Sequence, residues 1–87
     1  MSFDVSVIVP TLNEQDNIAR VYGEVRQATE KLKCEIVFVD DDSRDATRER
    51  VRDLQKQDSS VRLVHRIGRR GLSSALVIAA FVTRNAF

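Results

Sequence analysis

The chain has 87 residues, 43% hydrophobic and 31% charged, a composition that excludes a disordered chain and indicates one soluble globular domain or part of one. Its 14 basic and 13 acidic residues give a formal net charge of +1, so we expect no nucleic-acid partner. Cys34 is the only cysteine, which excludes an internal disulfide and a cysteine-rich zinc site.

Three short apolar runs predict strands: Val5–Val9, Ile36–Val39 and Val61–Val64. All three are rich in valine and isoleucine, which is typical of strands buried on both faces of a parallel sheet. The start of the chain lacks the pattern of a signal peptide, and we expect a cytoplasmic protein in a reducing compartment.

Helical patterns lie between the strands. The first helix is expected to present one apolar stripe, with Asn13 as its cap: Ile18, Val21, Tyr22, Val25, Ala28, Leu32. The second is expected from about Ala46 to Gln57, capped by Ser43 or Asp45 and facing inward with Thr47, Val51 and Leu54. The arginines of this segment (44, 48, 50 and 52) alternate with acids, which indicates a solvent face with intrahelical ion pairs.

A third helix is expected from Leu72 through Ala80. Val77, Ile78 and Phe81 would make it apolar nearly all round, so further protein or a second subunit should cover it. In the second case the chain would self-associate through this helix. The longest apolar run, Ala75 to Val82, has eight residues, against about 20 needed to span a bilayer.

The order strand–helix–strand–helix–strand–helix predicts an α/β protein with a three-layer Rossmann-like parallel sheet, βαβαβα, made by residues 1–87 as a single partial domain. Ligands of such sheets bind at the carboxyl ends of the strands. That edge should collect Pro10–Glu14, Asp40–Ser43 and His65–Arg70.

The three polar segments at this edge each allow two interpretations. Glu14 could bond a ribose hydroxyl or a base, or favour a helix start. Asp40, Asp41 and Asp42 repel one another by about 1 kcal/mol per pair in a wet setting, which favours a ligand over turn chemistry. A magnesium site there would want another carboxylate. Arg69 and Arg70, before a helix start, suit a diphosphate or a solvated loop.

Together these segments resemble the start of family 2 glycosyltransferases with the GT-A fold, above all the polyprenyl-phosphate enzymes such as dolichol-phosphate mannose synthases. The first segment, Val5–Glu14, is similar to that family's opening strand and Pro-Thr-Tyr-Asn-Glu turn. Ile36–Thr47 resembles its Asp-Asp-Gly-Ser-x-Asp-Gly-Thr segment, and Arg69–Ala75 its Gly-Leu-x-x-Ala helix start. Order and spacing agree over about residues 4–76.

The resemblance implies a nucleotide-sugar donor, carrying GDP or UDP, and in the intact protein transfer to a polyprenyl phosphate. The nucleotide site it implies consists of Pro10, Leu12, Glu14, Val39 and Asp41, with Arg69 and Arg70 as candidates for diphosphate contacts. It assigns no catalytic residue in this chain. A peripheral place on the cytoplasmic face of a membrane would suit such an acceptor.

Some positions depart from the family pattern. Leu12 replaces the usual tyrosine, and Asp42 and Ala46 replace customary glycines, of which Asp42 tolerates a left-handed backbone better. No Asp or Glu follows Asp58, so the Asp-x-Asp motif for Mg²⁺ or Mn²⁺ is not found here. On this interpretation the chain is truncated before its metal ligands and is inactive alone.

Other functions stay open. A dinucleotide-binding domain would use the acid after the second strand, but the first turn lacks Gly-x-Gly-x-x-Gly. A phosphoacceptor domain would want acids after the first and third strands, where Pro10 and His65 stand. A non-catalytic nucleotide-binding or interaction module of Rossmann-like fold is the remaining alternative.

Overall fold

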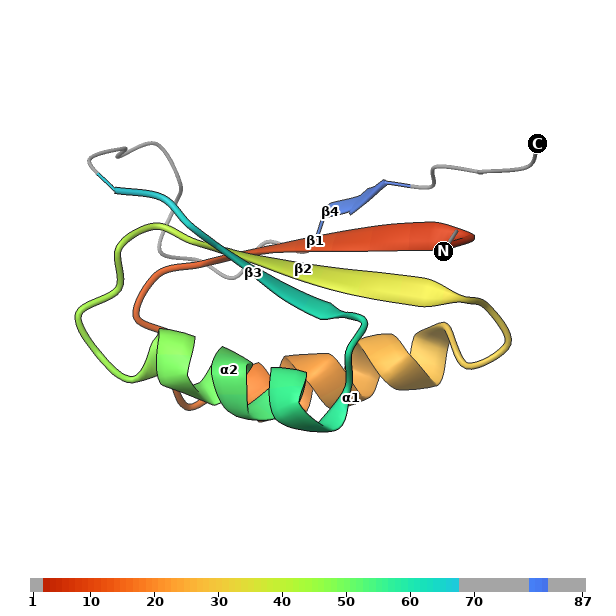
Figure 1. Ribbon diagram of the computed structural model, residues 1–87, viewed down its shortest axis with the longest axis horizontal. Helices are drawn as coiled ribbons and strands as arrows, with labels where there is room; N and C mark the ends of the chain where they lie inside the picture. Colours follow the sequence, from red (N-terminus) through yellow and green to blue (C-terminus); the bar gives the residue numbers. More distant parts are fainter. Residues whose placement is uncertain (1–2, 68–78, 82–87) are drawn as a thin grey trace.

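The computed structural model of the chain describes residues 3–67 and 79–81. Within them the elements are, in chain order, β1 (Val5–Thr11), α1 (Ile18–Ala28), β2 (Cys34–Asp40), α2 (Thr47–Gln57), β3 (Val61–His65) and β4 (Ala79–Phe81). The strands form one sheet in the order β3-β2-β1-β4. Figure 1 shows both helices on the same face of that sheet.

The three predicted strands pair in parallel, as expected. β1 pairs with β2, and β2 with β3, in parallel, with Val9 opposite Phe38 and Phe38 opposite Leu63. The chain moves in one direction from β1 to β3, and crossovers of one hand then place α1 and α2 on one face (Figure 1). The Rossmann-like alternation is confirmed, and in the described residues the helix layer covers this single face.

The core lies between the sheet and the two helices. Along β1 every second side chain is buried, and the helices add the fully buried Ile18, Val21 and Val51. The strands contribute the following buried apolar side chains to the same cluster: Val5, Val7, Val9, Cys34, Ile36, Phe38, Val61. Removal of this apolar surface from water is the main favourable term in folding.

The first helix differs from its prediction at both ends. It begins at Ile18 after Asn17, so Asn13 is not its cap; Asn13 has φ 51°, a left-handed backbone that cannot start a helix. The apolar stripe is also shorter, because the helix ends at Ala28 and Leu32 lies beyond it, 47% exposed. The second helix matches its predicted bounds within a residue, with Thr47 and Val51 buried, but the residue at its cap is Ala46 and not the predicted Ser43 or Asp45.

The predicted third helix is wrong at its end. Ala79–Phe81 is a strand that pairs antiparallel with β1, and residues 68–78 lie outside the described residues. A short apolar run suits strand and helix alike, and the backbone groups on the free edge of β1 decide for the strand. Of the predicted self-association surface only Ala79–Phe81 is described, and this part is a strand, not a helix.

A hydrogen-bond network around Asp58 lies at the amino ends of β2 and β3, opposite the carboxyl ends of the strands. Asp58 follows α2, and its carboxylate accepts hydrogen bonds from Tyr22 at 2.7 Å, from Arg26 at 2.6 and 3.0 Å, and from Ser60 at 2.6 and 3.0 Å. Arg26 also donates to the carbonyl of Cys34 at 3.0 Å. The network joins the end of α1, the start of β2 and the turn before β3.

Asp58→Asn should lower the free energy of unfolding by about 1–2 kcal/mol at pH 7, because the amide replaces a charged acceptor. Burial alone would raise the pKa of Asp58, but these hydrogen bonds outweigh it and hold the pKa well below the ordinary 3.8. The contribution is therefore present above about pH 4 and lost as the pH falls below it. Urea denaturation at pH 7 and pH 3 measures this: the difference between wild type and variant should shrink at pH 3. Asp53→Asn, at an exposed pair with Lys56, is the control and should change little.

Candidate functional site

The carboxyl ends of β1 and β2 lead into two turns that lie side by side. We call residues 12–17 the first turn and residues 41–46 the acidic turn. The pairing of the strands continues past Thr11 and Asp40, since the Asp41 N–H donates to the Thr11 carbonyl at 3.0 Å. The sequence thus correctly placed Pro10–Glu14 and Asp40–Ser43 at one edge.

Asp40, the last residue of β2, is fully buried and organises the acidic turn. Its carboxylate accepts hydrogen bonds from the Thr11 hydroxyl at 2.9 Å, the Ser43 N–H at 2.9 Å and Arg48 Nη1 at 2.7 Å, and a further one from the Ser43 hydroxyl. Burial alone would raise the pKa of Asp40, but these bonds outweigh it and hold the pKa below its ordinary value. Asp40 is therefore a structural anchor with its acceptor sites in use, where the sequence suggested a ligand contact.

Hydrogen bonds in both directions join the first turn to the acidic turn. The Asn13 N–H donates to the Ser43 hydroxyl at 2.8 Å, and Asn13 Oδ1 accepts from the Arg44 N–H at 2.9 Å. Three more hydrogen bonds also run between a backbone N–H and a side-chain oxygen. They are Glu14 N–H to Thr47 Oγ1 at 2.9 Å, Gln15 N–H to Asp45 Oδ2 at 3.2 Å, and Ala46 N–H to Gln15 Oε1 at 2.9 Å. The two turns therefore form one connected unit.

The backbone conformation of this unit shows whether Asp42 and Ala46 can stand where the family pattern has glycine. Asp42 has φ 60°, the left-handed conformation that aspartate tolerates, as expected from its side chain. Ala46 has φ −87°, which is an ordinary conformation for any residue. Its substitution for glycine therefore costs the backbone nothing here.

Asp41 differs from its two acidic neighbours. It is 7% exposed, and its Oδ1 is buried without a hydrogen-bond partner. Within residues 3–67 and 79–81 no hydrogen bond to either oxygen of this carboxylate is present, although its backbone N–H is bonded to Thr11. A buried carboxylate without a donor is costly, which marks Asp41 as the acid that a ligand would relieve.

The other predicted residues that the structure describes belong to β1, the first turn and β2. Pro10 and Val39 are register partners, half-buried on the sheet face away from the helices, and Leu12 is half-buried at the start of the first turn. Glu14 Oε1 accepts from Asn17 at 2.9 Å, while Oε2 has no partner among the described residues. Arg69 and Arg70 lie outside the described residues.

Arg48 and His65 have roles that the sequence did not indicate. Arg48 was expected on a solvent face, but it bonds Asp40 and also donates to the Ser43 carbonyl at 3.0 Å. His65 Nε2 lies 2.8 Å from Asp42 Oδ1. The one available signal for Arg48 was its place next to the inward-facing Thr47, in the helical turn nearest the end of β2.

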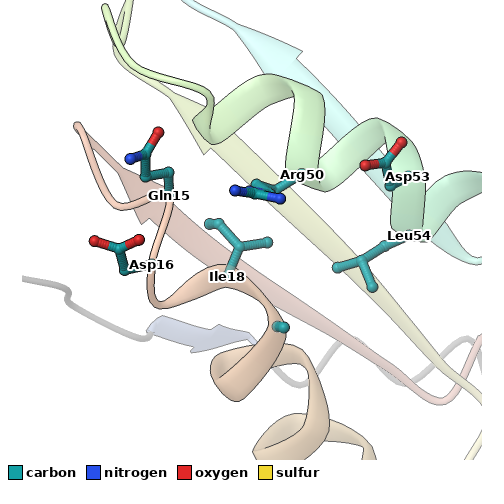
Figure 2. Close-up of a pocket in the computed structure, with 7 residues that line it drawn as sticks. Gln15, Asp16, Ile18, Arg50, Asp53 and Leu54 are labelled. Atoms are coloured by element: carbon teal, nitrogen blue, oxygen red, sulfur yellow. The ribbon is translucent and has the colours of Figure 1, made fainter.

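A separate hollow of about 340 Å³ lies between the start of α1 and the middle of α2. Figure 2 shows Arg50 of α2 extending toward Ile18 of α1, with Gln15 and Asp16 at one end and Asp53 and Leu54 at the other. None of the five residues predicted to hold the nucleotide lines it. The hollow is therefore distinct from the strand-end site.

Three properties bear on metal and membrane chemistry. Within the described residues no group of three or more His, Cys, Asp or Glu side chains is arranged to hold a metal ion. In the same part of the chain, no helix has the length and apolar character needed to cross a bilayer. Cys34 is a free, buried thiol.

The chain is similar to known proteins over most of its length. The family model described as glycosyl transferase family 2 matches residues 6–86. Dolichol-phosphate mannosyltransferases of Pyrococcus furiosus and Saccharomyces cerevisiae are each 41% identical to the chain, over 84% and 88% of it. That of Mycosarcoma maydis is 40% identical over 83% of the chain. The matches cover 20%, 30% and 26% of these relatives, so the chain spans less than a third of their length.

Asp40→Asn should lower the free energy of unfolding by about 2–3 kcal/mol at pH 7, because an amide cannot accept all these bonds and Arg48 loses its partner. Asp41→Asn should change it by less than about 1 kcal/mol or stabilise the chain, since it removes an unrelieved carboxylate. Urea denaturation of the two variants measures the contrast. Equal losses in both would show that Asp40 is not the anchor of the turns.

Proposed function

Because the chain belongs to glycosyl transferase family 2, we propose that it provides the donor-nucleotide part of a glycosyltransferase site. The observation that supports this most directly is Asp41, a buried carboxylate without a donor at the carboxyl edge of a parallel sheet. Ligands of open α/β sheets bind at that edge. Ribose hydroxyls and the N–H groups of a nucleobase are suitable donors to such a carboxylate.

The neighbouring residues suit the remaining surface of a nucleoside. Pro10, Val39 and Leu12 are apolar and half-buried, so they would form a wall for a planar base. Glu14 would add its free oxygen Oε2 as a second acceptor, with the carboxylate oriented by Asn17. The bonds between the two turns fix these groups before a ligand arrives, which lowers the entropy cost of binding.

The diphosphate and the sugar extend beyond the described residues in this proposal. Arg69 and Arg70 would contact the diphosphate of the GDP- or UDP-sugar. A divalent cation, Mg²⁺ or Mn²⁺, would neutralise the leaving diphosphate when bound. It would need ligands other than the described side chains, which hold no suitable cluster.

The names of the relatives support an acceptor for the intact protein. Proteins called dolichol-phosphate mannosyltransferases match the chain over most of its length, so we propose transfer of the sugar to a polyprenyl phosphate. Such an acceptor would place the intact protein peripherally on the cytoplasmic face of a membrane. The 87 residues alone should bind nucleotide weakly and transfer no sugar.

Titration of the chain with GDP, UDP and ADP, followed by calorimetry or amide chemical shifts, tests the proposal. We expect GDP or UDP to bind, and Asp41→Asn to weaken that binding about tenfold, because a charged acceptor is replaced by a neutral one. Asp53→Asn, an equal change of charge on α2, is the control and should leave affinity unchanged. The proposal fails if neither GDP nor UDP binds at millimolar concentration, or if Asp41→Asn binds as wild type does.

A further inference from the structure

The acidic turn makes a contact with the third strand that the proposed function does not use. At its tip, Asp42 Oδ1 lies 2.8 Å from His65 Nε2, at the last residue of β3. The backbone joins the same places, since the Arg66 N–H donates to the Asp40 carbonyl at 2.8 Å. The acidic turn is thus held on three sides: by the first turn, by α2 through Arg48, and by β3 through His65.

The conformation of Asp42 makes this contact more than incidental. A left-handed backbone at φ 60° costs a non-glycine residue of order 1 kcal/mol, whereas glycine adopts it freely. Among residues 3–67 and 79–81 the carboxylate makes no hydrogen bond other than that to His65, and Arg48 Nη1 is 3.9 Å away. The side chain therefore contributes a link to β3 that glycine could not make.

We propose that Asp42 and His65 form a clasp that positions the acidic turn, and with it Asp41, for ligand binding. Asp42 and His65 are positioning residues in this inference, since they act through Asp41. The effect on ligand affinity rests on the proposed nucleotide function. The effect on the turn itself does not.

The surroundings of the pair set the size of the effect. Arg48 of α2, which binds Asp40 at 2.7 Å, also has its Nη1 3.9 Å from Asp42 Oδ1. Because the pair is partly exposed, the contribution of the clasp should be modest.

Hydrogen exchange of the free chain tests the clasp without a ligand. The probes are the Ser43 and Arg44 N–H groups, which bond Asp40 and Asn13. After correction for intrinsic exchange rates, their protection should be about two- to threefold greater in wild type than in His65→Ala. His65→Gln, whose amide can still donate to Asp42, should restore part of that protection. Arg62→Gln removes a charge from the same strand, at its pair with Glu35, and should keep the wild-type protection.

Nucleotide titration of the same four proteins tests the consequence for binding. His65→Ala should bind GDP or UDP about two- to threefold more weakly than wild type, and Arg62→Gln should bind as wild type does. If protection responds to His65 but no nucleotide binds, the proposed function fails while the clasp stands. If protection is the same in wild type and His65→Ala, the clasp is overturned whatever the nucleotides do.

Discussion

The site depends on one buried charge. The Asp40 carboxylate has none of its surface in water, and an isolated charge in that position would be very costly. The chain satisfies it with hydrogen bonds from β1, from the acidic turn and from α2, through Thr11, Ser43 and Arg48. Each of these donors belongs to a different segment, so satisfying one carboxylate fixes the relative positions of all three.

The three consecutive aspartates therefore do three different things. Asp40 is turned inward and bonded, which leaves it no capacity for a ligand. Asp41 is buried with its Oδ1 unpartnered, and Asp42 is exposed and contacts His65. Two of the three have a donor or cation nearby, which relieves the repulsion expected of adjacent carboxylates. Asp41 is the aspartate whose negative charge remains without a donor or cation among the described residues.

The hydrogen-bond networks around Asp58 and Asp40 lie at opposite ends of the parallel strands. Around Asp58, Arg26 and Tyr22 join α1 to the turn before β3, at the end of the strands away from the site. Around Asp40 the corresponding contacts shape the two site turns. A substitution at Asp58 should thus affect stability without altering the site directly, because distant networks with no shared partners behave almost independently.

The sequence by itself determined the parallel strands, the two helices and the edge at which Pro10, Val39 and Asp41 meet, because apolar periodicity and turn residues are local signals. It did not determine that Arg48 turns inward, that His65 reaches Asp42, or that Ala79–Phe81 pairs with β1 as a strand. Each of these depends on a partner that is distant along the chain or that only the folded sheet brings near. Only the tertiary structure decides them, because a buried charge or a free strand edge exists only after the sheet has formed.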